Sequence, residues 1–393
     1  MTRAGHAVVI GEALVDLLES GDPIVYHPAI GGAPLNVAVG IARLGAPSEF
    51  AGSLGDDPWA TRILDFLTTS GVGTRGVTTV PGVATTLAVT TFRGIEPTFR
   101  FYGEPPSYGL LTDVDTDLVA TAGLLYCGSM CLLSPPVLAA ARNAWATPGP
   151  IRVFDPNVRP VVGVDPAVVA EFAATADLVK LSSADAAALW GESPEQAAAR
   201  LLALGAGAVV VTIGAEGALV ALATNPVTIG AEDALTTHAT NPVTTGAEDA
   251  LTTNPTAPTT PHTPAPPTTA PAAHPAATAP APAAPTPATT APATAAANAR
   301  ATPPAAARAI ATVRVAAPDV VAVDATGAGD ATMAGLSWGI LTHGLPTDLA
   351  GWERLTRFAV HVAGLVCESR GGAVSMPTLA ALRARFPSLE LVQ

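Results

Sequence analysis

Cysteine, aromatic residues and charged residues are all scarce in this chain of 393 residues. It contains 3 cysteines, 5% aromatic residues and 13% charged residues. Three cysteines cannot form the paired framework of a small secreted domain, and no cysteine or histidine cluster has zinc-site spacing. Folding must therefore rest on an aliphatic core, which 49% hydrophobic residues can supply in a large domain.

Long apolar runs and targeting segments are missing as well. No stretch reaches the roughly 18 consecutive apolar residues of a membrane-spanning helix, and no secretory leader precedes the apolar segment at 7–10. The formal net charge of −13 disfavours nucleic acid and anionic membranes as partners. We therefore expect a cytoplasmic protein that binds small molecules, with neither nucleic acid nor membrane among its partners.

One long tract, 223–307, differs from the rest of the chain in composition. It has no aromatic residue and few charged ones. The charged residues are Glu232, Asp233, Glu248, Asp249 and Arg300. Such a segment cannot bury enough apolar surface to offset the loss of chain entropy, so we predict a disordered insertion rich in alanine, proline and threonine. Its first part repeats with a 16-residue period, from position 223 to position 239.

Outside this tract, short apolar segments alternate with alanine-rich helical ones, as expected for a single domain over 1–393. Strands are predicted at 7–10, 124–127, 151–154, 178–181, 208–212 and 320–323. Helices are predicted at 36–44, 59–68, 194–203, 330–341 and 354–367. This alternation is typical of an α/β fold whose mainly parallel sheet lies between helices. Strand-like segments at 14–30 and 85–102 interrupt the pattern, and we expect them to pair as a small separate sheet.

Segment 323–331 carries the clearest chemical signal. Its sequence, VDATGAGDA, follows an apolar stretch and opens a helix. Small residues at 327–329 let the backbone approach a ligand closely, while the N–H groups of a first helical turn and the helix dipole favour an anion there. Asp330 beside this anion hole can orient a hydroxyl group and accept its proton. An aspartate that only caps a helix gives the same pattern, so the segment alone leaves both interpretations open.

Two motifs in this order resemble the signatures of the ribokinase-like (PfkB) carbohydrate kinases. They are GGAPLN at 31–36 and DATGAGD at 324–330. The resemblance covers nearly all of the chain outside 223–307. It implies a three-layer α/β/α sandwich with a mainly parallel sheet, a small β-sheet lid formed by 12–30 and 85–103, and ATP-dependent phosphorylation of a sugar hydroxyl.

The resemblance also implies roles for individual residues. Asp330 would be the catalytic base, and the anion hole would use the backbone amides of Gly327, Ala328, Gly329 and Asp330. The sugar would be bound by Asp16, Gly31, Gly32, Asn36 and Arg159. ATP and the waters of its Mg²⁺ would be bordered by Lys180, Ser182, Asp185, Thr212, Gly214 and Gly217. Ser182 and Asp185 replace the Asn and Glu that the family often has, which leaves a shorter carboxylate to act on the metal through water.

A monovalent cation, K⁺, is a further expectation, because the family often binds one beside the anion hole. Its ligands would be mostly backbone carbonyls. The residues at comparable positions are Asp324, Thr326, Cys367, Arg370 and Gly372. Such a cation would act by fixing the anion hole before the reaction.

Four motifs bear on the identity of the sugar. GEALVD at 11–16, GGAP at 31–34, DPNVRP at 155–160 and VTIGAEGAL at 211–219 resemble those of fructokinases, which favours fructose as substrate and fructose 6-phosphate as product. A kinase for 2-keto-3-deoxygluconate, ribose or a nucleoside is an alternative, as is a catalytically silent sugar- or nucleotide-binding protein on the same fold. Similar kinases often dimerise through the lid, so a homodimer is expected too.

Overall fold

The computed structural model describes residues 5–19, 25–93, 96–158, 163, 165–224 and 309–390. The described elements belong to one unit, which the chain forms on both sides of 228–306. The tract predicted to be disordered lies outside the described residues, except that Ala223 and Thr224 belong to a strand. Arg159, expected at the sugar, also lies outside them.

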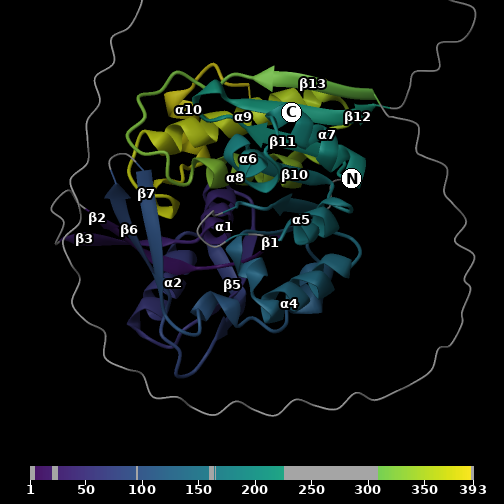
Figure 1. The fold of residues 1–393 in the computed structure, drawn as a ribbon. Coiled ribbons are helices and arrows are strands. Elements are labelled where there is room, and N and C mark those ends of the chain that lie inside the picture. Colours follow the sequence, from purple (N-terminus) through teal and green to yellow (C-terminus); the bar gives the residue numbers. More distant parts are fainter. Residues whose placement is uncertain are drawn as a thin grey trace, which may run out of the picture. The chain divides into compact units, whose positions relative to one another are not determined.

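A nine-stranded sheet forms the centre of the fold (Figure 1). Its order is β13-β12-β11-β10-β9-β8-β1-β4-β5. The strands are β1 Ala7–Ile10, β4 Ser48–Leu54, β5 Val72–Thr79, β8 Leu124–Gly128, β9 Ile151–Asp155, β10 Leu178–Ser182, β11 Ala208–Thr212, β12 Ala218–Thr224 and β13 Ala309–Val315. All pairings from β5 to β11 are parallel, whereas β12 and β13 are antiparallel additions. The expected α/β fold with a mainly parallel sheet is confirmed.

Helices cover both faces of this sheet because its strands are apolar on both sides. In β1, Ala7 and Val9 belong to one core, and Val8 and Ile10 belong to the other. The first core includes side chains of α1 Ala33–Arg43, α2 Pro58–Thr69, α8 Ala328–His343, α9 Leu349–Cys367 and α10 Leu379–Arg385. The second includes side chains of α3 Thr116–Ala120, α4 Pro135–Ala146, α5 Pro166–Ala173, α6 Ser183–Trp190 and α7 Pro194–Leu204.

A second, four-stranded sheet has the order β3-β2-β6-β7. Its strands are β2 Leu14–Glu19, β3 Tyr26–Gly31, β6 Leu87–Arg93 and β7 Glu96–Tyr102. The pairs β2–β3 and β6–β7 are antiparallel hairpins, and the two hairpins join through a parallel β2–β6 pairing. The two segments expected to form a small sheet therefore do pair with one another.

The strand predicted at 320–323 is not formed. This stretch is irregular, and the side chains of Val321 and Val323 are 83% and 57% exposed. The backbone N–H of Val323 donates to the carbonyl of Cys367 at 2.7 Å, so the segment is tied to the end of α9. The sheet edge is already occupied by β13. The apolar residues at 320–323 predict a strand, but they lie in an irregular connection on the surface.

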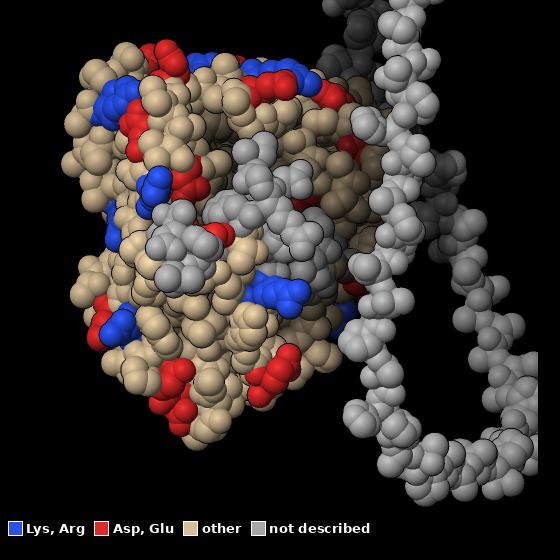
Figure 2. Space-filling view, turned by 60° about the vertical axis from the view of Figure 1, so that its left-hand side comes forward, with Lys and Arg blue, Asp and Glu red and all other residues tan. Residues whose placement is uncertain are grey.

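The surface of the described unit is chemically mixed. Basic and acidic side chains are interspersed among uncharged residues on the face shown in Figure 2. Within the ranges that the structure describes, no helix combines the length and the apolar character needed to cross a membrane.

The β12–β13 hairpin shows where the long tract joins the fold. Thr224 and Ala309 are register partners at the end of the hairpin. Because β12 runs antiparallel to β11, this end lies at the edge of the sheet opposite the carboxyl ends of the parallel strands. In open α/β folds the ligand-binding edge is the one at the carboxyl ends.

Replacing 225–308 with a two-residue Asn-Gly turn should leave the fold intact. The two flanking residues already face each other, and this turn closes adjacent antiparallel strands. The free energy of unfolding should rise by up to about 3 kcal/mol, because a shorter loop costs less entropy to close. Urea denaturation measures the change, and a scrambled tract of the same length is the control. A loss of stability on deletion would show that the tract supports the fold.

Candidate active site

The first turn of α8 depends on Gly327, the residue that caps it. Gly327 has a φ of 80°, in the left-handed region that glycine adopts without strain. The space is also tight, since a Cβ at this position would lie 2.8 Å from the Cα of Gly372. This turn places Asp330 within the first helical turn, where it is buried with 6% of its surface exposed.

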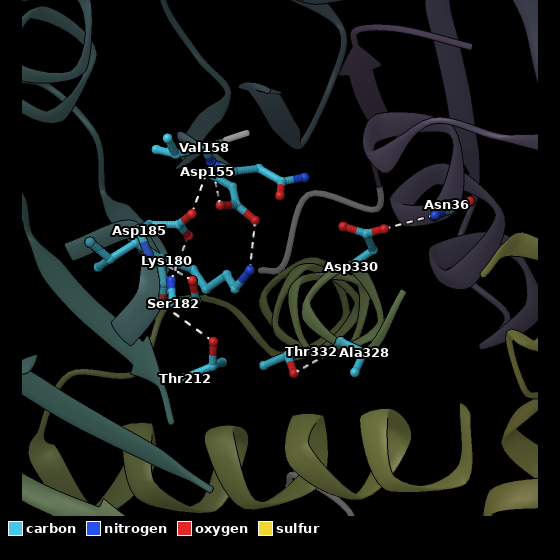
Figure 3. Close-up of polar contacts among 12 residues, drawn as sticks. Asn36, Asp155, Val158, Lys180, Ser182, Asp185, Thr212, Ala328, Asp330 and Thr332 are labelled. Carbon is cyan, nitrogen blue, oxygen red and sulfur yellow. Dashed lines mark hydrogen bonds and ion pairs between the residues drawn. The ribbon is translucent and has the colours of Figure 1, made fainter. Parts of the chain in front are cut away.

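Asn36, on α1, holds the carboxylate of Asp330. Its Nδ2 donates to Oδ2 of Asp330 at 2.7 Å, across a sequence separation of 294 residues (Figure 3). Sequence reasoning expected Asn36 to reach a sugar hydroxyl and did not foresee this contact. The other polar atom of Asn36, Oδ1, is buried and has no hydrogen-bond partner within the described part of the chain.

The backbone amides at the start of α8 were expected to form an anion hole. The first N–H groups of a helix have no acceptor within it, and the dipole favours an anion there. In this turn the N–H of Ala328 donates to the carbonyl of Ala325 at 3.1 Å. The N–H of Ala328 is thus less available to bind an anion than expected, because it already donates within the turn.

A buried ion pair lies in the same region (Figure 3). Nζ of Lys180 lies 2.9 Å from Oδ2 of Asp155, and the two side chains are 3% and 0% exposed. Burial raises the pKa of Asp155 to about 6, against the opposing effect of Lys180, and the charges of Asp185 and Asp330 add to the rise. Burial disfavours the charged form of Lys180. The nearby carboxylates of Asp155, Asp185 and Asp330 outweigh this effect, so the pKa of Lys180 is raised. As pH falls, Asp155 is therefore the partner that loses its charge, whereas Lys180 stays protonated.

Lys180 also approaches the opening turn of α8. A Cβ at Gly329 would lie 3.0 Å from its Nζ. An ammonium this close to a helix N-terminus strengthens the attraction for an anion. Sequence reasoning placed Lys180 at the ATP phosphates but missed Asp155, which holds it. The available signal was an acidic residue at the end of an apolar strand.

Ser182 and Asp185, expected near the waters of Mg²⁺, form the N-terminal cap of α6. The N–H of Asp185 donates to Oγ of Ser182 at 3.0 Å, and the N–H of Ser182 donates to Oδ2 of Asp185 at 2.8 Å. The other oxygen of Asp185, Oδ1, accepts from the N–H of Val158 at 3.0 Å. This capping accounts for both residue types by itself. Any contact with a hydrated metal ion would use the remaining lone pairs.

The three residues expected beside the ATP phosphates lie at the carboxyl end of β11. Thr212 ends that strand, and its Oγ1 donates to the carbonyl of Leu181 at 3.4 Å. Gly214 and Gly217 have φ values of 55° and 96°. A Cβ at Gly217 would lie 2.0 Å from the carbonyl oxygen of Val315, so packing against the end of β13 already requires glycine. At Gly214 the surroundings are open, and only the backbone conformation favours glycine.

The residues expected around the sugar meet where the small sheet joins α1. A Cβ at Gly31 would lie 2.0 Å from Oδ2 of Asp16, so these two residues are in direct contact across β2 and β3. Gly32, with a φ of 115°, is the residue before α1, and a Cβ there would lie 2.4 Å from the carbonyl oxygen of Glu12. Asn36 follows one helical turn later, so the four expected sugar ligands that the structure describes share one region.

Asp324, the expected cation ligand, joins the turn before α8 to the segment after α9. Its Oδ1 accepts from the N–H of Thr326 at 2.9 Å, and its Oδ2 accepts from the N–H of Gly371 at 3.0 Å. Burial opposes the charge of this carboxylate, but the hydrogen bonds and the charge of Arg370 outweigh burial and lower its pKa.

The carbonyls expected to bind a monovalent cation are engaged within the protein. That of Cys367 accepts from the N–H groups of Val323 and Asp324, at 2.7 and 3.2 Å. That of Arg370 accepts from Oγ of Ser375 at 2.9 Å. Among the described residues, no group of three or more His, Cys, Asp or Glu side chains is arranged to hold a metal ion. A K⁺ site here stays a prediction, and these internal hydrogen bonds compete with it.

Comparison with known proteins decides what kind of protein carries this site. Residues 6–252 and 306–379 match the pfkB family of carbohydrate kinases. The chain belongs to this family. The match includes both motifs that meet at the Asn36–Asp330 hydrogen bond.

Curated fructokinases are similar to part of this pfkB chain. A probable chloroplastic fructokinase-6 of Arabidopsis thaliana is 34% identical over 206 residues, which make up 48% of this chain and 54% of that protein. The chain spans about half the length of the curated relatives it matches.

Two fructokinase structures are similar to nearly the whole chain. The enzyme from Xylella fastidiosa with bound ATP has a TM-score of 0.68 at 21% identity, covering 98% of each chain. The one from Vibrio cholerae O395, bound to fructose, ADP and calcium ion, has a TM-score of 0.67 at 24% identity, covering 99% of this chain and 100% of that one. At these identities the likeness shows a common fold.

Replacing Gly327 with alanine should destabilise the protein more than replacing Gly191, the residue that follows α6. Both glycines are in the left-handed helical region, with φ and ψ of 80° and 1° at Gly327 and of 67° and 26° at Gly191, but Gly191 has open space around it. Gly191→Ala should cost about 1 kcal/mol for the backbone conformation alone. Gly327→Ala should cost about 1–3 kcal/mol more, because its Cβ meets the backbone of Gly372. Urea denaturation compares the two variants, and equal losses would contradict this account of the turn.

Proposed function

We propose that this protein transfers the γ-phosphoryl group of ATP to a sugar hydroxyl, and that its substrate is fructose and its product fructose 6-phosphate. The Asn36–Asp330 hydrogen bond carries the proposal, because it places an oriented carboxylate beside the N-terminus of α8. Membership of the pfkB family supports the same activity, as does likeness to fructokinase structures that hold ATP, or fructose and ADP.

In the proposed reaction, Asp330 accepts the proton of the attacking hydroxyl group. Asn36 keeps the carboxylate in one orientation by donating to Oδ2. The hydroxyl oxygen forms a bond to the γ-phosphorus as the bond to the leaving oxygen of ADP breaks. Because the base is already fixed by a buried contact, little reorganisation is needed when the substrate arrives.

The transferred phosphoryl group is stabilised by positive charge at the opening of α8. The N-terminal amides of the helix and the ammonium of Lys180 both face this region, and Asp155 holds the ammonium in place. Such preorganised donors stabilise the transition state more than the ground state. Thr212, Gly214 and Gly217 are proposed to border the ATP phosphates from the end of β11.

Mg²⁺ bound with ATP would neutralise charge on the β- and γ-phosphates. The donor set of this chain fits such an ion only through water. Both oxygens of Asp185 accept backbone hydrogen bonds, and Ser182 is its capping partner. We propose that these two residues orient waters of the ion through their remaining lone pairs.

The sugar is proposed to bind where the small sheet meets α1. Asp16 and Asn36 are proposed to bind sugar hydroxyls, and the missing side chains of Gly31 and Gly32 let Asp16 and the carbonyl of Glu12 lie against the start of α1. The sheet of β2, β3, β6 and β7 beside this region would limit access of water, which would otherwise accept the phosphoryl group.

Replacing Asp330 with asparagine should lower kcat by about 10²–10⁴-fold, because the general base is lost while the side-chain volume is kept. ADP release in a coupled assay with fructose measures the rate. Asp348→Asn, at the N-cap of α9, is a matched control that should keep kcat. A kcat for Asp330→Asn within threefold of the unaltered protein would remove Asp330 from the reaction.

A substrate panel separates the proposed activity from its alternatives. The value of kcat/KM should be highest for fructose among fructose, ribose, 2-keto-3-deoxygluconate and a nucleoside. A higher value for another sugar would correct the substrate alone. Binding of sugar or ATP without ADP release would favour a catalytically silent protein on the same fold.

A further inference from the structure

Arg43, the last residue of α1, holds the segment that follows α9. Its Nη1 donates to the carbonyls of Ala373, Val374 and Met376 at 3.2, 3.0 and 2.9 Å. Its Nη2 donates to Oγ of Ser70 at 3.4 Å. Hydrogen bonds from a charged donor are stronger than those between neutral groups. One guanidinium therefore fixes the path of the backbone through 373–376.

The same segment packs against the opening turn of α8. A Cβ at Gly372 would lie 2.8 Å from Nδ2 of Asn36, and a Cβ at Gly327 would lie 2.8 Å from the Cα of Gly372. Asp324 holds the start of the segment through the N–H of Gly371. The segment 371–376 thus contacts Arg43 through 373–376, and contacts Asn36 and Gly327 through Gly372.

Helix α1 contacts Asp330 near its N-terminus and the segment 373–376 at its C-terminus. Asn36 lies in its first turns and contacts Asp330, while Arg43 ends the helix and contacts 373–376. Glycine is required at 327 by φ and by the closeness of Gly372. A shift of 371–376 would therefore move Gly372, against which both Asn36 and Gly327 are packed.

We propose that Arg43 is a positioning residue for the phosphoryl transfer put forward above, on which this inference rests. The hydrogen bonds that the structure describes for Arg43 go to Ser70 and to 373–376, none of which is assigned to base, sugar or ATP. It acts through segment 371–376, which keeps the α8 turn and Asn36 in place. Without Arg43, the anion hole must reorganise during the reaction, which raises the free energy of the transition state. We therefore expect kcat to fall more than the affinity for sugar or ATP.

Two substitutions test the role of the guanidinium. Arg43→Met keeps the aliphatic stem and removes every donor. Arg43→Lys keeps the charge, but a compact ammonium cannot reproduce the fork that reaches three carbonyls and a hydroxyl.

Arg385→Met is the matched control. Arg385 also ends a helix, and its guanidinium lies 4.8 Å from the ring centre of Phe386, as that of Arg43 lies 5.7 Å from Phe66. Its hydrogen bonds go to Glu368, three residues before Gly371, and to the carbonyl of Asp319, so none of them reaches 371–376.

Arg43→Met should lower kcat by about tenfold or more, with KM values for sugar and ATP within about threefold. Arg43→Lys should recover part of the loss, and Arg385→Met should keep kcat. A kcat for Arg43→Met equal to that of Arg385→Met, or a change confined to KM, would overturn the inference. If Arg43→Met does not fold, Arg43→Lys takes its place in the comparison with Arg385→Met, with a smaller fall in kcat expected.

Hydrogen–deuterium exchange gives a readout that does not depend on activity. Peptides covering 327–331 should exchange faster in Arg43→Met, or in Arg43→Lys, than in Arg385→Met. If the unaltered protein releases no ADP but exchange at 327–331 rises as expected, the proposed function fails and the positioning contact stands. Unchanged exchange would overturn the positioning contact itself.

Discussion

The hydrogen bond between Asn36 and Asp330 is the contact on which the rest of the site depends. It joins α1 to α8, and the backbone must come unusually close for it to form. Gly32 lets α1 begin against the carbonyl of Glu12, and Gly327 lets α8 begin against Gly372. Two glycines with left-handed φ thus bring together side chains from opposite ends of the chain.

Buried carboxylates outnumber the buried ammonium near this contact. One buried ammonium, on Lys180, interacts with the carboxylates of Asp155, Asp185 and Asp330. Asp185 is compensated by two backbone N–H donors, and Asp330 by Asn36. Asp155 accepts from the N–H of Asn157 and is paired with Lys180, but burial outweighs the effect of Lys180 and raises its pKa to about 6. The ion pair therefore places a firmly charged ammonium next to the amides of α8.

The layered fold followed from the sequence because local and global signals agreed. The apolar run at β1 is buried on both faces, as the alternation of strands and helices predicted. The strand expected at 320–323 does not form, because β13 already occupies that edge of the sheet. An apolar sequence does not show whether a sheet edge is free. The tract boundary was off by two residues for a similar reason, since Ala223 and Thr224 are fixed by pairing with β13.

The site was predictable in its parts but not in its contacts. The motif around 324–330 indicated an anion hole and a base, whereas the partners Asn36, Asp155 and Arg43 depend on which elements become neighbours. Asp155 meets Lys180 because β9 and β10 pair in parallel with Phe154 opposite Val179, a register that neither strand specifies alone. Ser182 and Asp185 illustrate the reverse, because their spacing suited both a metal site and a capping box.

A crystal structure with ADP, aluminium fluoride and fructose tests the central claim most directly. The account predicts that the fluoride lies about 2.7–3.1 Å from amides at the start of α8 and that the sugar O6 lies about 2.6–3.2 Å from the carboxylate of Asp330. Fluoride bound away from the first turn of α8, or a sugar with no hydroxyl facing Asp330, would contradict it.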